Sequence, residues 1–103
     1  MQPLPSDTEV VTRHLAGDPG AFGTLVDRYE MSLVRFVDGK IGDSERALEL
    51  VQDVFVRVMR HLRWFDQREQ FSTWIYAIAA AVAKAELQHR SRGAIRTKGA
   101  IPW

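Results

Sequence analysis

The 103 residues of this chain are 46% hydrophobic, which is enough apolar material for the core of one small domain. The absence of cysteine excludes disulfides and cysteine-ligated metal sites and favours the cytoplasm, and no signal peptide or apolar run of roughly 18 residues predicts export or membrane insertion. The net charge of +1 is distributed unevenly: residues 1–53 sum to −5 (five Lys or Arg, ten Asp or Glu) and residues 54–103 to +6 (nine against three), which fits either solvated helix faces or a polyanion-binding second half.

Helix start and stop signals divide the chain into four segments. Ser6 followed three residues later by Glu9 forms a capping box, and Gly17 supplies a left-handed stop. A short first helix is therefore predicted from Asp7 to Ala16.

The second helix is predicted to begin at Asp18 as its cap, with Pro19 in the first position, where the missing N–H is tolerated. Gly39 and Gly42 are expected to end it. Its apolar residues recur at spacings of three and four, and they are Phe22, Leu25, Val26, Tyr29, Leu33, Phe36 and Val37.

Asp43 or Ser44 caps a third helix, which is expected to end near Arg63. Its core stripe consists of Ala47, Leu50, Val51, Val54, Val58 and Leu62. Residues 64–70 break the helical periodicity and are predicted to form a loop.

A fourth amphipathic helix follows the loop and is predicted to stop at Gly93. Its apolar face consists of Phe71, Trp74, Ile75, Ile78, Val82 and Leu87. Residues 94–103 have no usable period. The expected fold class is therefore all-α, a small bundle of about four helices, with a helical domain over residues 1–92 and a flexible tail or linker over residues 93–103.

The third helix carries a second stripe beside its core face, formed at spacings of four, three and four by Leu48, Gln52, Phe55 and Met59. Together with Glu49 and Asp53 it makes a mixed apolar and acidic face of the kind that docks a partner helix. The alternative is that these residues pack against the first helix, because small bundles often bury a helix on two sides.

A cluster of aromatic and basic residues surrounds the predicted loop. Its aromatic members are Trp64, Phe65, Phe71, Trp74 and Tyr76, and its basic members are Arg57, Arg60, Arg63 and Arg68, followed by Lys84, Arg90 and Arg92. Aromatic faces stack unpaired bases at about 1 to 3 kcal/mol each while cations follow the phosphates, so the cluster predicts binding of single-stranded nucleic acid. Phe71 and Trp74 are expected in the core. Trp64 and Phe65 could equally be exposed to stack a base or be packed against the protein.

No catalytic constellation is found in the sequence. The three histidines, His14, His61 and His89, lie far apart and none has metal-ligand spacing with a carboxylate. The serines lack a nucleophile-elbow context, and no glycine-rich phosphate loop follows a strand. We therefore expect a binding protein rather than an enzyme, with no metal, no cofactor and no small-molecule substrate.

Several phrases of the sequence match one known family in their order along the chain. The chain resembles region 2 of extracytoplasmic-function sigma factors from about Ser6 to Arg92. The matching phrases are Gly17-Asp18 followed by Ala21-Phe22, then Leu25-Val26-Asp27-Arg28-Tyr29, Leu50-Val51-Gln52-Asp53-Val54-Phe55, and Phe71-Ser72-Thr73-Trp74-Ile75-Tyr76-Ala77-Ile78-Ala79. Each phrase is weak alone, but the ordered set is specific.

The resemblance implies a domain that binds core RNA polymerase, recognises and melts the promoter minus-ten element in transcription initiation, and has an anti-sigma factor as a further partner. It implies that the clamp helices of the polymerase β′ subunit bind Leu48, Glu49, Gln52, Asp53 and Met59. It also implies that the non-template single strand lies on the loop and the fourth helix, with a flipped base held between Phe65 and Thr73. The residues assigned to DNA in this way, together with the basic cluster, are Arg57, Arg60, Trp64, Phe65, Arg68, Phe71, Ser72, Thr73, Trp74 and Lys84.

The chain departs from the family in two respects. Ala81 and Ala85 replace an Asn and a second polar residue that many members carry, and alanine cannot hydrogen-bond to a base edge. Region 4, which reads the minus-thirty-five element, is absent, as in an excised domain or a protein whose partner supplies that part. The competing hypothesis is therefore a protein-interaction module that keeps the polymerase or anti-sigma surface but has lost sequence-specific DNA readout.

Overall fold

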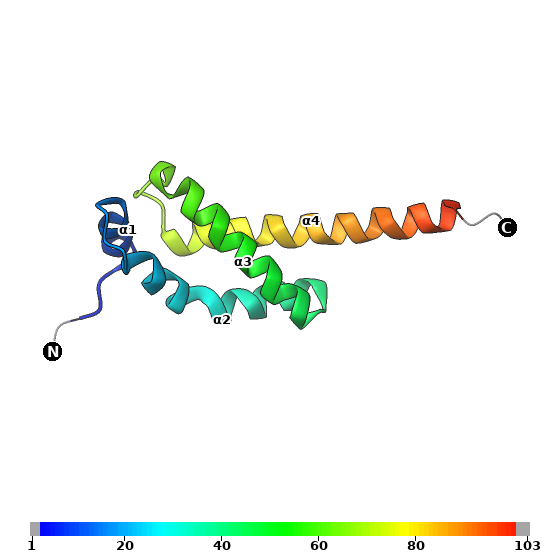
Figure 1. The fold of residues 1–103 in the computed structure, drawn as a ribbon, viewed down its shortest axis with the longest axis horizontal. Helices are drawn as coiled ribbons and strands as arrows, with labels where there is room; N and C mark the ends of the chain where they lie inside the picture. The colour runs from blue at the N-terminus through cyan, green and yellow to red at the C-terminus, as the bar shows by residue number, and fades with distance from the viewer. Residues whose placement is uncertain (1–2, 101–103) are drawn as a thin grey trace.

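All regular structure in the computed structural model is helical over the residues it describes, which are 3–100, with side chains described as far as residue 92 (Figure 1). The elements in chain order are α1 (Asp7–Leu15), α2 (Ala21–Ile41), α3 (Ser44–His61), the 3₁₀ helix η1 (Leu62–Trp64) and α4 (Phe71–Ala100). Figure 1 shows α3 crossing both α2 and α4, while α1 packs against α2 and η1. The prediction of an all-α fold with four helices is confirmed.

The two predicted caps of α1 and α3 are present. The Ser6 hydroxyl accepts a hydrogen bond from the N–H of Glu9 at 3.1 Å, and the Asp43 carboxylate accepts one from the N–H of Arg46 at 3.1 Å. Gly17 follows α1 with φ +98°, a left-handed conformation that favours glycine, as predicted. Helix α3 ends at His61, and the three residues of η1 follow it, so Trp64, which was predicted to lie in the loop, is the last residue of η1.

The predicted start of α2 needs correction, and of the two glycines predicted to end the helix only Gly42 does so. Helix α2 begins at Ala21 rather than Pro19, because the Asp18 carboxylate accepts from the N–H of Gly20 at 2.9 Å and closes a turn before the helix. Helix α2 also continues through Gly39 to Ile41, which is buried against the core and anchors the last turn. Gly42, at φ +68°, is the residue that ends it.

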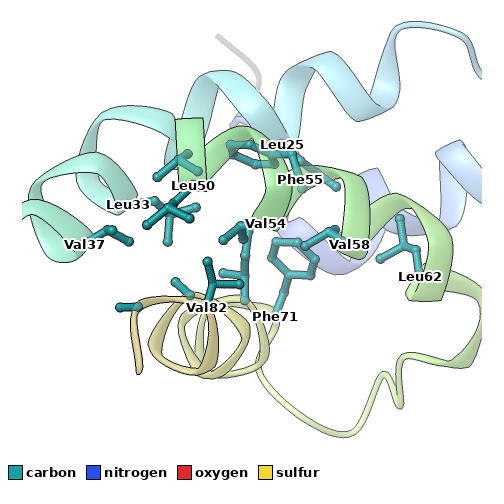
Figure 2. Packing of buried hydrophobic residues seen from close by; sticks show 14 of the residues in the cluster. Leu25, Leu33, Val37, Leu50, Val54, Phe55, Val58, Leu62, Phe71 and Val82 are labelled. Carbon is teal, nitrogen blue, oxygen red and sulfur yellow. The ribbon is translucent and has the colours of Figure 1, made fainter. Parts of the chain in front are cut away.

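The core lies where α3 packs against α2 and α4 (Figure 2). The predicted stripe of α3 is confirmed, since every member is buried: Ala47, Leu50, Val51, Val54 and Val58 on the helix and Leu62 in η1. Figure 2 shows Leu25, Leu33 and Val37 of α2 on one side of this stripe and Phe71 and Val82 of α4 on the other. Leu87, predicted on the apolar face of α4, is instead 41% exposed.

Polar contacts fix α1 to α2 near the amino terminus. The Asp7 carboxylate accepts hydrogen bonds from the Arg28 guanidinium at 2.9 Å and from the Tyr29 hydroxyl, and Arg28 also donates to the Pro5 carbonyl at 2.6 Å. Burial, followed by the contact with Asp7, raises the pKa of Tyr29 above its usual value. These contacts give a structural role to the Arg28-Tyr29 pair of the family phrase.

A second polar network ties the start of α3 and the end of α2 to α4. The Glu86 carboxylate accepts from Arg46 at 3.0 Å and from Arg90 at 3.0 Å, and Arg90 also donates to the Ile41 carbonyl at 3.0 Å. The hydrogen bond from Arg46 is the main reason that the pKa of Glu86 lies below its usual range. The network holds the three helices together at the end of the bundle distant from the loop.

The predicted stop of α4 at Gly93 is wrong, because the helix continues to Ala100. Glycine costs only about 1 kcal/mol relative to alanine in a helix interior, and the residues around it include helix formers such as Arg92 and Ala94. The last part of the predicted tail, 101–103, lies outside the described residues, and the flexible linker stays a prediction. No helix in the described range has the length and apolarity needed to cross a membrane.

Candidate nucleic-acid and protein interfaces

The second stripe of α3 forms one wall of an apolar groove whose other wall is α2. The groove has a volume of about 250 Å³ and is lined by Val26, Glu30 and Val34 from α2 and by Leu48, Val51, Gln52 and Phe55 from α3. The α2 wall was not predicted from the sequence as part of an interface. The spacing of four between Val26, Glu30 and Val34 is a signal that places them on one side of a helix, but it does not say which neighbour that side meets.

Two of the five residues predicted to bind polymerase, Leu48 and Gln52, line this groove, whereas Asp53 lines a second depression between α3 and α4. Leu48 and Met59 are 49% and 52% exposed, and Gln52 is also exposed. The Glu49 carboxylate pairs with Arg46 at 2.7 Å, and the Asp53 carboxylate pairs with Arg57 at 3.3 Å. Ion pairs at this exposure contribute little free energy to folding, so both carboxylates can exchange partners readily.

Phe55 is buried, so for this residue the alternative that the stripe packs against a neighbouring helix is correct. Its ring is 8% exposed and meets the Phe22 ring edge-on at 6.4 Å between centroids. The neighbour is the start of α2 rather than the first helix. Of the four residues of the stripe, Phe55 is therefore core, whereas Leu48, Gln52 and Met59 are open surface.

The loop that joins η1 to α4 is supported by an aromatic cluster consisting of Phe65, Phe71 and Trp74. The Phe65 ring lies 5.7 Å from Phe71 and 5.0 Å from Trp74 between centroids. Phe65 is 7% exposed and Phe71 is 3% exposed, whereas Trp74 is half-buried. Phe65 therefore does not offer an exposed face for stacking, because its ring packs against Phe71 and Trp74 in the first turn of α4.

Trp64 is the exposed member of the adjacent aromatic pair. Its side chain is 69% exposed at the end of η1, with the Arg63 guanidinium 4.9 Å from its ring centroid and the His61 ring 6.0 Å away. Arg60 is exposed one turn earlier on α3. This corner of the molecule therefore combines one open aromatic face with cations, the combination that single strands require.

The remaining loop residues form a small turn centred on Asp66. Its carboxylate accepts from the Arg68 N–H at 2.9 Å and from the Arg68 guanidinium at 3.1 Å, and these bonds hold the pKa of Asp66 below its usual range. The Gln67 amide donates to the Thr12 hydroxyl of α1 at 3.5 Å. Arg68 is thus exposed but partly neutralised, and α1 contributes to the position of the loop.

The start and the middle of α4 present the other residues assigned to DNA. Ser72 is half-buried, and Thr73 and Lys84 are exposed. Ala81 and Ala85 are also exposed, so this helix offers few side-chain hydrogen bonds to a base edge. Among the described residues, no three His, Asp or Glu side chains are arranged to hold a metal ion.

Comparison with known proteins gives a consistent set of matches. Residues 25–93 match the family described as Sigma-70 region 2. The chain is 33% identical over 86 residues to the RNA polymerase sigma-H factor of Pseudomonas aeruginosa, covering 84% of this chain and 45% of that protein. It is 32% identical over 87 residues to the ECF RNA polymerase sigma-E factor of Escherichia coli, again covering 84% of this chain and 45% of the relative. The chain thus spans less than half the length of these relatives.

A solved structure is similar over nearly the whole chain. It is described as the NMR structure of the complex formed by an engineered region 2 of sigmaE in complex with GTAAAA. The TM-score is 0.80 at 35% sequence identity, and the match covers 89% of this chain and 96% of the other.

Proposed function

The chain belongs to the sigma-70 region 2 family, and on that premise we propose that it is a sigma-factor domain that binds core RNA polymerase and recognises and melts the promoter minus-ten element. The observation that carries the proposal is the similarity to the engineered region 2 of sigmaE, whose complex contains the oligonucleotide GTAAAA. The exposed aromatic and basic corner at the end of η1 supports it independently.

The DNA-binding part of the proposal assigns different tasks to neighbouring aromatic residues. Trp64 stacks an unpaired base, because its face is open and flanked by the cations of Arg60 and Arg63. Phe65 and Phe71 support the loop from below, because their rings are buried. Phosphates of the strand are attracted by the remaining assigned cations, Arg57, Arg68 and Lys84, and Ser72, Thr73 and the half-buried Trp74 line the path along α4.

The polymerase-binding part uses the groove between α2 and α3. Leu48 and Met59 supply exposed apolar side chains, and Gln52 lies between them on the helix. Glu49 and Asp53 add negative charge that exposed arginines neutralise only weakly. A helix with an apolar stripe and basic flanks, which is the chemistry expected of the β′ clamp helices, fits this surface.

The test of DNA binding is fluorescence anisotropy with a single-stranded non-template minus-ten oligonucleotide and the same sequence as duplex, with core polymerase added. Wild type should prefer the single strand, and Trp64→Ala should weaken that binding by about 1 to 3 kcal/mol. Met31→Ala removes another exposed side chain, 62% exposed on α2, and should change nothing. Equal affinity of wild type and Trp64→Ala for both probes would leave only non-specific attraction and refute this part.

The test of polymerase binding is a pull-down with the β′ clamp helices. The double substitution Glu49→Ala with Gln52→Ala should weaken binding, while the melting curve stays within about 0.5 kcal/mol of wild type because both residues are exposed. Gln88→Ala, at an exposed position on α4, is the matched control. Undiminished capture by the double variant would remove the assignment.

A second candidate function is a protein-interaction module without sequence-specific readout. The exposure of Ala81 and Ala85 favours it, because the side of α4 that follows the loop lacks donors and acceptors at these positions. Binding that is equal for all single-stranded sequences, combined with intact β′ capture, would select this candidate. An anti-sigma factor would then compete for the same groove.

A further inference from the structure

The side of α3 that faces away from the core forms a continuous exposed surface, which we call the outer stripe. Its residues recur at spacings of three and four, and all are exposed: Glu45, Glu49, Gln52, Val56 and Arg60 on the helix and Arg63 in η1. With 3.6 residues per turn, the five helical positions fall within an arc of about 80°. The buried stripe lies on the opposite side of α3, where the helix crosses α2 and α4 (Figure 1). The packing of the bundle therefore leaves the outer stripe open.

Charges of opposite sign are separated along the outer stripe and its margin. The amino-terminal half carries the acids Glu45, Glu49 and Asp53, and the carboxyl-terminal half carries the arginines Arg57, Arg60 and Arg63. Complementarity with the helix dipole accounts for charges in the first and last turns of a helix only. Glu49, Asp53 and Arg57 lie in the middle turns of α3, so the separation extends beyond what the helix dipole explains.

Exposed apolar side chains lie between the two charged halves. Val56 is 46% exposed in the middle of the outer stripe, and Leu48 and Met59 lie along one edge of it at 49% and 52% exposed. A helix on the surface of a bundle needs one apolar stripe to pack, and the buried stripe of α3 already provides it. These three side chains are therefore available for contact with another molecule.

The charged side chains of the outer stripe are only weakly engaged within the chain. The Asp53 carboxylate pairs with Arg57 at 3.3 Å, but both side chains are about half exposed, and such pairs contribute little free energy. Among the ion pairs of the described residues, none involves Glu45, Arg60 or Arg63. Acids at one end and arginines at the other can thus pair with a partner of the opposite sign.

The order of the charges makes the outer stripe complementary to itself in the antiparallel orientation. A two-fold axis perpendicular to α3 at the level of Val54 exchanges the two halves. Glu45 and Arg63 each lie about 14 Å from this level, at 1.5 Å per residue in the α-helix and 2.0 Å in the 3₁₀ helix. Glu49 and Arg60 lie about 8 and 9 Å from it on opposite sides. The rotation therefore places acids of one copy opposite arginines of the other and brings the two apolar centres together, whereas a parallel pair would oppose like charges.

We propose that the free chain forms an antiparallel homodimer through the outer stripe of α3, and that core polymerase and a second copy compete for this face. The competition rests on the proposed function, because Glu49 and Gln52 belong both to the outer stripe and to the surface assigned to polymerase. A two-fold dimer uses the same patch on both copies, as a self-complementary stripe requires. One helix from each copy makes a small interface, in the class below about 1,200 Å² that is weak and transient. The dimer therefore yields its surface when polymerase is present.

Sedimentation equilibrium of the full 103-residue chain, from about 10 µM to about 1 mM because a small interface is weak, measures the self-association. The variants Glu45→Lys and Arg63→Glu each reverse one charge of the outer stripe, and Arg35→Glu, exposed on α2, is the charge-matched control. Each stripe variant opposes like charges at two places in its dimer, so its dissociation constant should rise by about tenfold. Arg35→Glu should match wild type, and circular dichroism melts verify that every variant is folded.

An equimolar mixture of the two stripe variants tests the antiparallel arrangement itself. In a mixed dimer, the lysine introduced at position 45 of one chain faces the glutamate introduced at position 63 of the other, and the unchanged Arg63 and Glu45 face each other at the second place. Opposite charges then meet at both places, so the mixture should associate about as strongly as wild type. The double variant, which exchanges the two charges within one chain, should also dimerise. Addition of the β′ clamp helices in excess should convert the wild-type dimer to one chain bound per clamp.

Three outcomes would overturn the proposal. A wild-type chain that stays monomeric at the highest concentration forms no such dimer. Self-association that neither charge reversal weakens, or a mixture of the two variants that stays monomeric, contradicts the antiparallel contact of the outer stripes. A dimer that binds the clamp helices without dissociating contradicts the competition. Failure of the proposed function is distinct, because the wild-type chain would then dimerise as described but would not capture the clamp helices.

Discussion

Replacing Val54 by Asp should unfold the domain at neutral pH. The Val54 side chain has no exposed surface and lies in the core between α2 and α4 (Figure 2). The substitution removes about 1.5 to 3 kcal/mol of hydrophobic burial. The introduced carboxyl must also take up a proton to stay buried, which costs about 4 kcal/mol at pH 7 for a usual pKa near 3.9. Burial of the neutral polar group costs about 1 to 3 kcal/mol more, and the total rivals the roughly 5 to 15 kcal/mol that stabilise a small domain.

Circular dichroism melts and urea titrations between pH 4 and 7 measure this cost. The matched control is Val56→Asp, two residues along α3 at a position that is 46% exposed, where the change should stay within about 0.5 kcal/mol. Burial raises the pKa of the carboxyl introduced at Val54, so the deficit should narrow as the pH falls toward 4. Equal melting temperatures for the two variants would refute the assignment of the core face of α3.

Three further predictions concern stability. Gly39→Ala should stabilise the domain by about 0.5 to 1 kcal/mol, because Gly39 lies in an exposed helical position with open space at its Cβ. Gly42→Ala should destabilise it by about 1 to 2 kcal/mol, because φ at Gly42 is +68°. Melting temperatures of the two variants measure both effects. Glu86→Gln should lower the melting temperature at pH 7. Because the pKa of Glu86 is lowered chiefly by Arg46, the wild-type carboxylate stabilises the domain above pH about 4.3, and this contribution is lost as the pH falls further. In a melting series, the difference between variant and wild type should therefore disappear at low pH. Tyr29→Phe should cost about 1.5 to 3 kcal/mol in a urea titration, and because the pKa of Tyr29 is raised, the deficit should be constant below pH about 10 and shrink above it.

Sequence reasoning succeeded where one local interaction decides the structure. The caps at Ser6 and Asp43 depend on side chains that reach only three residues along the chain, and the left-handed end at Gly42 depends on a single φ angle. It failed at Gly39 and Gly93, where a weak stop signal of about 1 kcal/mol competes with continued helix formation. At Gly39 the burial of residues in the next turn decides the outcome, and that burial depends on packing between helices.

The interfaces show the same limit in a different form. Periodicity correctly placed Leu48 and Met59 on a surface separate from the core, but it could not show that α2 supplies the opposite wall of the groove. It also could not separate Trp64 from Phe65, since adjacent residues outside a regular helix have no fixed angular relation. The turn geometry of η1 exposes the first ring and buries the second.

Helix α3 connects the two proposed interfaces physically. Its buried stripe fixes its rotation between α2 and α4, and that rotation directs Leu48 and Gln52 toward the groove. Helix α3 is followed directly by η1, which ends at Trp64, so the packing of the α3 core also sets the position of the Trp64 ring. Residues in this core should therefore affect polymerase capture and single-strand binding together, whereas surface substitutions at Gln52 or Trp64 should each affect one activity. Because the buried stripe and the exposed residues belong to one rigid helix, a rotation of α3 caused by repacking at Val58 would turn both surfaces together.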